Sequence, residues 1–279
     1  MAETDVIYLD NNATTRVAPE VVEAMLPMFS ELYGNASSMH TFGGQMGRYV
    51  SRAREQAAEL IGALPEEIIF TSCGTESDST AIYSALETQP EKRHFITTRV
   101  EHPAVLALGH LLETKGYDVT WLGVDSRGRL DLDELAAAIR HDTALVSIMY
   151  ANNEIGTLQP IAEIGRICRE KKVLFHTDAV QAVGHVPVDV VRDQVDMLSL
   201  SAHKFHGPKG IGLLYARKGV NVATLIEGGA QERGKRAGTE NLPAIIGMAA
   251  ALQDACDHMK ENTDRVLPMR ERLIEELSK

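Results

Sequence analysis

The chain has 279 residues, with 28 Lys and Arg against 39 Asp and Glu, and therefore a formal net charge of −11 when its histidines are neutral. This acidic balance argues against nucleic acid or an anionic membrane as the main partner. A content of 44% hydrophobic and 24% charged residues is typical of a globular protein with one large core, and excludes disordered, collagen-like and coiled-coil chains.

Strand-like and helix-like segments alternate along most of the chain. Short apolar, β-branched runs predict seven strands, at residues 67–71, 94–98, 119–122, 144–149, 173–176, 197–200 and 211–216. Segments with helical periodicity predict helices at about 47–61, 76–86, 104–114, 132–140, 161–171 and 243–259. This order predicts an α/β fold with a mostly parallel seven-stranded sheet sandwiched by helices.

Three of these helices carry start signals. Asp131, followed three residues later by Glu134, predicts the N-cap of the helix that begins at residue 132. Pro103 and Pro160 suit the openings of two further helices.

The last segment, 264–279, has the pattern of an amphipathic helix and ends without a capping glycine. Its apolar stripe needs a surface to pack against. Either the helix folds back on the domain or the natural chain continues, and we favour the second explanation.

The absence of targeting signals and the spacing of the cysteines indicate where in the cell the protein is expected. The longest apolar stretch, 244–252, is shorter than the ~20 residues that cross a bilayer, and the first ten residues lack the pattern of a secretory signal. Cys73, Cys168 and Cys256 are an odd number at wide spacings, which fits neither a disulfide framework nor a zinc finger. We therefore expect a cytoplasmic protein without a membrane partner.

The segment 199–212 reads Ser-Leu-Ser-Ala-His-Lys-Phe-His-Gly-Pro-Lys-Gly-Ile-Gly, so that Lys204 comes directly after a predicted strand and before glycines that permit tight turns. An amine in this position can attack an aldehyde to form an imine, which is how proteins commonly hold pyridoxal phosphate. The alternative is a surface lysine in a glycine-rich loop.

Asp178 follows the predicted strand 173–176 and lies 26 residues before Lys204 in the sequence. Open α/β sheets bind ligands at the carboxyl ends of their strands. A carboxylate there would keep a pyridine nitrogen protonated, because an ion pair in a poorly solvated pocket favours both charged forms. The alternative is a helix cap or a turn residue.

A small-residue turn at 71–75 leads from a predicted strand into a predicted helix. Its free backbone amides and the helix dipole would attract a phosphate group, with Gly74 and the hydroxyl of Thr75 in the turn. Thr75 could equally be an N-cap. Neither a P-loop nor a dinucleotide-binding glycine pattern occurs in the sequence.

Other polar residues interrupt apolar surroundings. His102 could stack on an aromatic cofactor and Asn153 could hydrogen-bond it, although both residue types are also common in loops. A metal site formed by His203, His206 and His176 fits the spacing of zinc ligands poorly, and we predict no metal.

Six motifs in order give the chain a family resemblance. They are Thr-Glu-Ser at 75–77, Glu-His at 101–102, Asn-Asn-Glu at 152–154, His-Thr-Asp-Ala-Val-Gln at 176–181, Ser-Ala-His-Lys at 201–204 and Arg-Ala-Gly-Thr-Glu-Asn at 236–241. The chain resembles the class V aminotransferase superfamily and, within it, the cysteine desulfurases of the NifS type, which supply sulfur for nitrogenase clusters. The resemblance extends over nearly the whole chain and implies a fold-type I transferase dependent on pyridoxal 5'-phosphate.

The resemblance also implies a role for each matching residue. Lys204 would bind the cofactor covalently and move protons, and His102 would stack on the ring and assist catalysis. The remaining cofactor-binding positions would be Asp178 at the pyridine nitrogen, Gln181 at the phenolic oxygen, Gly74, Thr75, Ser201 and His203 at the phosphate, and Asn153 beside the substrate. Thr239 would reach the phosphate of a partner subunit, which implies a homodimer.

The implied reaction converts L-cysteine to L-alanine and leaves the sulfur as a persulfide on the enzyme, for transfer to an iron–sulfur scaffold or another acceptor protein. The family's nucleophilic cysteine and its substrate-clamping arginine have no counterpart in this chain. The resemblance therefore divides the chain into an N-terminal segment, 1–15, that belongs with a small domain, a large cofactor-binding domain, 16–260, and the start of a helix, 261–279, that leads to a missing small domain.

Other functions stay open at this point. A selenocysteine lyase shares the same cofactor residues, and a truncated, noncatalytic cofactor-binding protein is a further possibility. If the chain is complete as given, we expect weakened cofactor binding and no desulfuration.

Overall fold

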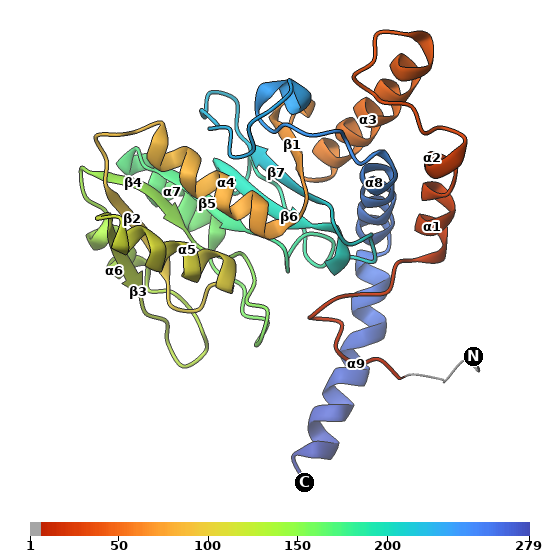
Figure 1. The fold of residues 1–279 in the computed structure, drawn as a ribbon. Helices are drawn as coiled ribbons and strands as arrows, with labels where there is room; N and C mark the ends of the chain where they lie inside the picture. Colours follow the sequence, from red (N-terminus) through yellow and green to blue (C-terminus); the bar gives the residue numbers. More distant parts are fainter. Residues whose placement is uncertain (1–6) are drawn as a thin grey trace.

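The computed structural model describes residues 7–279 and is built on a seven-stranded sheet (Figure 1). The strands are β1 (Ile68–Thr71), β2 (His94–Thr98), β3 (Asp118–Leu122), β4 (Thr143–Ser147), β5 (Leu174–Asp178), β6 (Met197–Ser201) and β7 (Gly212–Ala216). Their order is β1-β7-β6-β5-β4-β2-β3; β7 is antiparallel to both of its neighbours, and all other neighbours are parallel. The predicted mostly parallel sheet and its seven strands are confirmed, with strand ends shifted by one or two residues at most.

Helices cover both faces of the sheet, because successive side chains of each strand point to opposite sides. In β7, Leu213 and Tyr215 pack into one hydrophobic core, whereas Leu214 and Ala216 pack into the other. The second core lies under α4 (Gly74–Glu87) and α5 (Pro103–Thr114). The first and larger core lies under α3 (Thr41–Leu60), α6 (Leu132–Ala138), α7 (Ile161–Lys171) and α8 (Leu242–Asp257).

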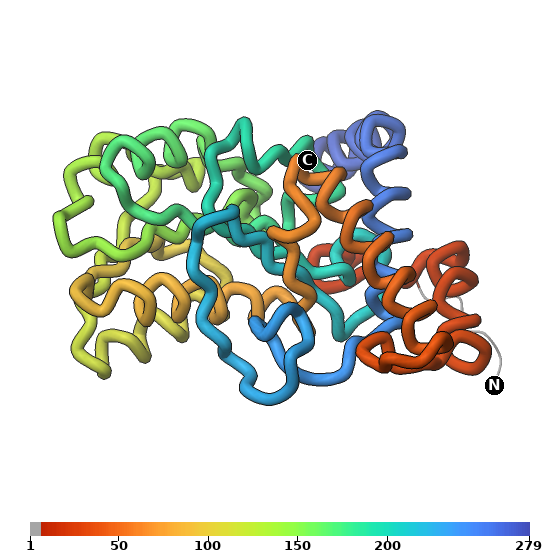
Figure 2. Tube along the Cα trace, turned by 90° about the horizontal axis from the view of Figure 1, so that it is seen from above, coloured from red at the N-terminus to blue at the C-terminus, as the bar shows by residue number. Residues whose placement is uncertain are grey.

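The N-terminal helices were only partly predicted. Helices α1 (Pro19–Met25) and α2 (Pro27–Ser30) are too short to show a helical period, and α3 begins six residues before the predicted start at residue 47. Its N-cap is His40, whose Nδ1 accepts a hydrogen bond from the backbone of Gly43 at 3.1 Å. Together with α8, these helices gather at one end of the molecule (Figure 2).

The predicted helix starts agree with the structure. Asp131 caps α6 by accepting hydrogen bonds from the backbone N–H groups of Asp133 (2.8 Å) and Glu134 (3.2 Å). Pro103 is the first residue of α5, and Pro160 is the N-cap of α7.

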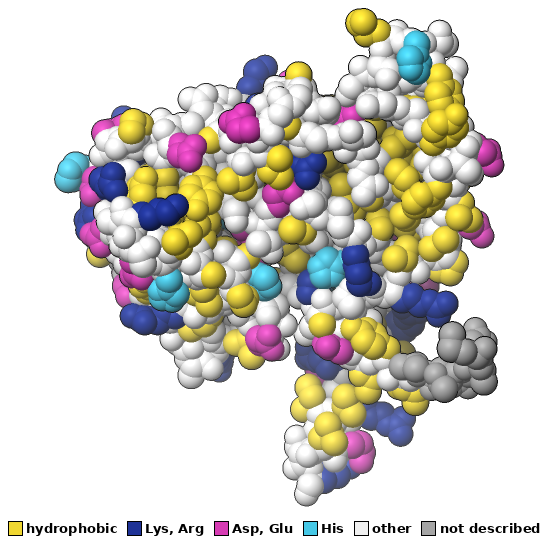
Figure 3. Space-filling model, in the orientation of Figure 1, with side chains coloured by type: hydrophobic (Ala, Val, Ile, Leu, Met, Phe, Trp, Pro, Cys, Tyr) yellow, Lys and Arg dark blue, Asp and Glu magenta, His cyan; other side chains and the backbone are white. Residues whose placement is uncertain are grey.

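The last helix, α9 (Met259–Leu277), confirms the predicted amphipathic helix and extends away from the sheet (Figure 1). None of its residues is buried. Its exposed apolar side chains are visible along the helix in Figure 3, and include Val266, Leu273 and Ile274. Among residues 7–279 no segment covers this stripe, so the helix does not fold back on the domain.

The topology brings polar residues together at one edge of the sheet. The parallel strands β5 and β6 end side by side, at Asp178 and Ser201. A short 3₁₀ turn, η2 (Ala202–Lys204), follows β6 directly, and α4 begins three residues after the end of β1. In the described part of the chain, no helix has both the length and the apolar character needed to span a bilayer.

Candidate active site

A cavity of about 540 Å³ opens at this edge of the sheet. Nine of the ten predicted site residues line it, from five separate segments of the chain. They are Gly74, Thr75, His102, Asn153, Asp178, Gln181, Ser201, His203 and Lys204.

Lys204 reaches the cavity from η2. Its Nζ donates hydrogen bonds to the backbone carbonyl oxygens of Asn12 and Ala13, the latter at 3.1 Å. Burial lowers the pKa of Lys204, an effect that the negative charge of Asp178 partly opposes. The amine is therefore closer to its neutral, nucleophilic form than a surface lysine is.

Asp178 lies at the floor of the cavity and is 5% exposed. Its Oδ1 accepts a hydrogen bond from the backbone N–H of Val180 at 2.9 Å. Burial raises the pKa of Asp178, while this hydrogen bond and the nearby His102 and Lys204 act in the opposite direction. Gln181, one turn further on, donates from Nε2 to the carbonyl oxygen of Asn12 at 3.0 Å.

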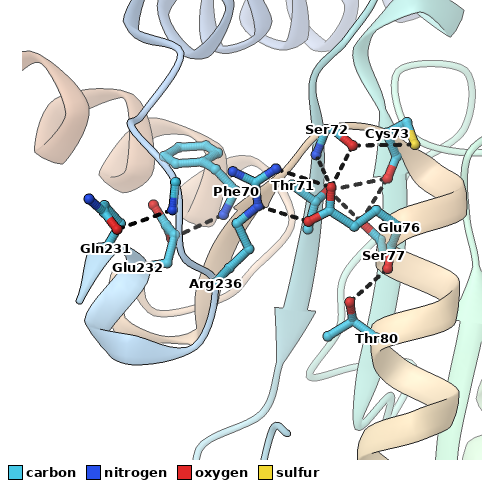
Figure 4. Close-up of polar contacts among 11 residues, drawn as sticks. Phe70, Thr71, Ser72, Cys73, Glu76, Ser77, Thr80, Gln231, Glu232 and Arg236 are labelled. Atoms are coloured by element: carbon cyan, nitrogen blue, oxygen red, sulfur yellow. Dashed lines mark hydrogen bonds and ion pairs between the residues drawn. The ribbon is translucent and has the colours of Figure 1, made fainter. Parts of the chain in front are cut away.

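The turn before α4 is tightly held (Figure 4). The Glu76 carboxylate accepts from the backbone N–H of Ser72 at 2.8 Å and from its hydroxyl at 2.5 Å, and Arg236 Nε donates to the other carboxylate oxygen at 2.9 Å. A Cβ on Gly74 would lie 2.8 Å from Cγ2 of Val180, so only glycine fits without displacing that side chain. The turn therefore presents the start of a 14-residue helix to the cavity, a position that attracts an anion.

Ser201, at the end of β6, and His203, in η2, line the same cavity. The His203 Nδ1 lies 3.1 Å from the hydroxyl of Thr14. Burial lowers the pKa of His203, and the positive charge of Lys204 lowers it further. A neutral imidazole can donate one hydrogen bond to an anion without adding a second charge.

His102 and Asn153 also form the local contacts expected of ordinary loop residues. His102 is the N-cap of α5, and its Nδ1 accepts from the backbone N–H of Ala104 at 3.2 Å. The Asn153 side chain donates to Glu154 Oε1 at 2.7 Å. Both residues nevertheless line the cavity, so these contacts orient them at its wall.

Thr239 does not join the other predicted residues. It lines a separate cavity of about 190 Å³, together with Ser72, Arg236 and Glu240. Within one chain, the structure therefore gives Thr239 no place in the main cavity.

The three histidines considered as metal ligands contact other groups instead. His176 is buried in β5, where its two ring nitrogens lie 2.8 Å from Ser147 Oγ and 2.9 Å from Ser199 Oγ. His206 Nδ1 lies 3.0 Å from the carbonyl oxygen of Arg16, and His203 contacts Thr14. Among residues 7–279, no three His, Cys, Asp or Glu side chains form a group that could hold a metal ion.

Two features of the cavity are not predicted from the sequence. The first is the N-terminal segment, in which Asp10, Asn12 and Ala13 close one side. The second is Asp78, a buried carboxyl that lines the cavity from α4. It lies four residues after Gly74, on the same face of α4.

Comparisons with known proteins agree with this geometry. Residues 7–278 match the family described as aminotransferase class-V. The chain belongs to the class-V aminotransferase family.

Several relatives of this class-V chain are cysteine desulfurases. A cysteine desulfurase from Nostoc sp. is 57% identical over 98% of this chain and 68% of its own length. The cysteine desulfurase NifS of Azotobacter vinelandii is 53% identical over 96% of this chain and 67% of its own length. This chain therefore spans about two thirds of these relatives.

Solved class-V structures match the fold closely. A structure titled NifS-like protein has a TM-score of 0.95 at 45% identity, covering 98% of this chain and 75% of its own. A structure of SspA in complex with cysteine has a TM-score of 0.86 at 41% identity, covering 89% of this chain and 72% of its own. The fold-type I architecture is thereby confirmed.

The class-V family uses pyridoxal phosphate, and the cavity has the features that this group requires. The floor carries a buried carboxyl, Asp178, whose side-chain hydrogen bond within the described residues comes from one backbone N–H. A protonated pyridine nitrogen would supply the missing cation. Lys204 offers an amine for the aldehyde, and the turn at 72–75 offers an anion site for the phosphate.

The three cysteines of the class-V chain differ in their surroundings. Cys168 is buried in α7, where burial raises its pKa to about 12, and burial also raises the pKa of Cys256. Thiols with raised pKa are poor nucleophiles at neutral pH. Cys73 lines the cavity, and its Sγ lies 3.7 Å from the hydroxyl oxygen of Ser72.

Glu101 gives this class-V fold a testable pH dependence. Burial raises its pKa to about 8, although its Oε1 accepts hydrogen bonds from Thr98 Oγ1 at 2.6 Å and from the backbone N–H of Met149 at 3.1 Å. The usual pKa is 4.5, so between these values the folded chain holds a proton that the unfolded chain has released. The free energy of unfolding therefore falls as the pH rises from about 5 to 8, by at most roughly 1.4 kcal/mol per pH unit from this group.

We expect the Glu101→Gln variant to lose this contribution and to show a flatter dependence on pH. Urea unfolding at several pH values measures it, with the exposed Glu170→Gln on α7 as the control that keeps the wild-type slope. Equal slopes for Glu101→Gln and wild type would show that Glu101 is ionised in the folded protein throughout this range.

Proposed function

We propose that this chain binds pyridoxal 5'-phosphate and carries the cofactor-dependent part of a cysteine desulfurase of the NifS type, with L-cysteine as substrate. The observation that carries the proposal is that Lys204 and Asp178, at the ends of two neighbouring parallel strands, line one cavity together with an anion-binding turn. The cysteine desulfurases at 53% and 57% identity support the choice of reaction. The cysteine complex of the structural relative SspA supports the choice of substrate.

Each residue contributes one interaction in this proposal. When bound, the cofactor withdraws electrons from the substrate carbon atoms next to its amino group. Asp178 holds the proton on the ring nitrogen, and Gln181 donates a hydrogen bond to the ring oxygen. Lys204 would hold the aldehyde of the cofactor in the resting state and would carry a proton to or from the substrate carbon.

The remaining groups position the reactants. Gly74, Thr75, Ser201 and His203 bind the phosphate, His102 stacks on the ring and assists proton transfer, and Asn153 orients the substrate. In the overall reaction the carbon–sulfur bond of cysteine breaks, its sulfur forms a bond with a protein thiolate, and the thiol proton ends on the carbon that becomes the methyl group of alanine. The thiolate becomes a persulfide, so that atoms and charge balance without an added oxidant.

The proposal extends to partners and location. We propose a cytoplasmic homodimer in which Thr239 contacts the phosphate bound by the other subunit, because Thr239 lies outside the main cavity of its own chain. The persulfide sulfur would pass to an iron–sulfur scaffold or another acceptor protein, for clusters that include those of nitrogenase. The resemblance to NifS supports this last step.

The experiment adds pyridoxal phosphate to the purified chain, reduces the mixture with borohydride and maps the labelled peptide. We expect a yellow protein that bleaches on reduction and carries the label on Lys204. Added L-cysteine should then change the absorption of the bound cofactor, whereas alanine is not expected from this chain by itself, because the family's nucleophilic cysteine has no counterpart among its residues.

Two results would count against the proposal in different ways. A colourless protein that takes up no pyridoxal phosphate would contradict the cofactor site. Bound cofactor whose absorption does not respond to L-cysteine would restrict the function of this chain to cofactor binding.

A further inference from the structure

Three buried carboxyl groups lie at or near the cavity: Asp178 and Asp78 line it, and Glu101 is close enough to Asp178 for their charges to interact. Asp178, Asp78 and Glu101 are 5%, 1% and 4% exposed. The function proposed above gives Asp178 a partner in the cofactor's ring nitrogen but gives no partner to the other two. Three ionised carboxylates could not be offset there by one pyridinium charge, because buried charges need nearby opposite charges.

Asp78 is the most isolated of the three. It lies one turn into α4, which packs on β5 and β6, and it lines the same cavity as Asp178. Its Oδ1 is buried and has no hydrogen-bond partner among the described residues. The nearby Ser199 lowers the pKa of Asp78 and so compensates only in part for its burial.

The groups that face Asp78 offer it no positive charge. The one basic side chain within 4.0 Å of the Asp78 carboxyl oxygens among the described residues is His176, whose Nε2 lies 3.6 Å from Oδ1. Burial lowers the pKa of His176 to about 3, and its two ring nitrogens already lie beside the hydroxyls of Ser147 and Ser199. The other facing groups, Asp178, Glu101 and Cys73, are acids whose ionisation would repel an anion at Asp78.

Asp178 differs because basic side chains lie near it. Lys204 and His102 both favour its ionised form, and Val180 donates a hydrogen bond to it. Burial and the charge of Asp178 together raise the pKa of Asp78 well above its usual value. When two such carboxyls interact, they share their protons, and the proton stays where no cation is near.

We propose that Asp78 is a positioning residue: as a neutral carboxylic acid beside Asp178, it leaves Asp178 as the anion that faces the cofactor's ring nitrogen. This inference rests on the proposed function. Asp78 itself forms no bond to the cofactor in this arrangement and acts through Asp178. If Asp78 were ionised as well, two carboxylates would compete for the proton of the ring nitrogen.

The first test determines whether the Asp78 side chain is protonated, and it is done without the cofactor. With ¹³C in the aspartate carboxyl groups, infrared difference spectra of wild type minus Asp78→Asn are recorded on the full chain at neutral pH. We expect the difference to contain the carbonyl band of a protonated acid. The paired bands of a carboxylate in its place would overturn the proposal.

The second test measures whether pyridoxal phosphate binds to the chain when residue 78 is neutral. An amide at position 78 resembles the protonated acid, so pyridoxal phosphate should bind to Asp78→Asn within about twofold of its wild-type dissociation constant, with an unchanged pH profile. Removing the charge from the proposed partner, in Asp178→Asn, should weaken binding by roughly tenfold or more. If Asp78→Asn weakened binding as much as Asp178→Asn, Asp78 would be an anion that binds the ring, and the proposal would be wrong.

A measurement on the wild-type chain covers the case in which Asp78→Asn does not fold. Carbon-13 NMR of the labelled carboxyl groups from pH 5 to 9 should show a buried aspartate, distinct from the one that responds to pyridoxal phosphate, that stays at its protonated shift. If all aspartate resonances titrate in the ordinary acidic range, the proposal fails. If the wild-type chain bound no pyridoxal phosphate, the proposed function would fail, whereas the spectra would still decide the charge of Asp78.

Discussion

Replacing Lys204 by alanine is expected to abolish covalent incorporation of pyridoxal phosphate. Lys204 is the lysine that lines the cavity, and burial lowers its pKa, so a larger fraction of its amine is neutral at pH 7 than for an exposed lysine. The readout is the borohydride-stable label, followed by mass spectrometry after reduction at several pH values. In wild type, labelling should increase with pH and level off below the range in which ordinary lysines lose their protons.

A nearby exposed lysine provides the control for this prediction. Lys209 lies five residues further along the same glycine-rich segment and does not line the cavity, so Lys209→Ala should be labelled as wild type is. Asp178 raises the pKa of Lys204, and Asp178→Asn should therefore shift the labelling profile to lower pH. Label that persisted at wild-type level in Lys204→Ala would place the reactive amine elsewhere.

The strands could be predicted because burial on both faces leaves a simple signal. β1, β4 and β6 are buried along their whole length, and in sequence they are short apolar runs bounded by polar turns. Helices α1 and α2, of seven and four residues, are too short for a period to emerge. The early start of α3 depends on a histidine cap, which is outside the usual set of Ser, Thr, Asp and Asn.

The site could be predicted where a polar residue follows a strand. Asp178 and Lys204 stand at such positions, and parallel neighbours place them at one edge of the sheet. Asp78 could not be found in this way, because the polar run Glu76 to Thr80 reads as a solvent-exposed helix face. It is buried because the strands under α4 carry polar side chains of their own, His176 and Ser199, and that pairing exists only in the fold.

The segment 225–241 had no predicted structure, and side-chain contacts determine its path. Within it, Glu232 and Arg233 adopt left-handed backbone conformations, with φ of 47° and 59°, which cost energy for residues other than glycine. The Glu232 carboxylate forms two hydrogen bonds with the Arg54 guanidinium, at 2.7 and 2.8 Å. It also accepts from the buried backbone N–H of Phe70 at 3.1 Å (Figure 4). Arg54 also stacks over the Phe70 ring, 4.6 Å from its centroid.

Replacing Glu232 by alanine is therefore expected to destabilise the chain strongly. The side chains of Arg54 and Glu232 are only 12% and 3% exposed, so the variant leaves a largely buried guanidinium without its counter-charge. We expect a loss of about 3–5 kcal/mol in the free energy of unfolding, measured by urea denaturation. The matched control is Glu170→Ala, which breaks the exposed pair with Arg166, also at 2.7 Å, and should cost less than about 1 kcal/mol. Equal losses in the two variants would mean that solvent screens the Arg54–Glu232 pair as well. The segment that carries Thr239 would then need another explanation for its strained path across β1.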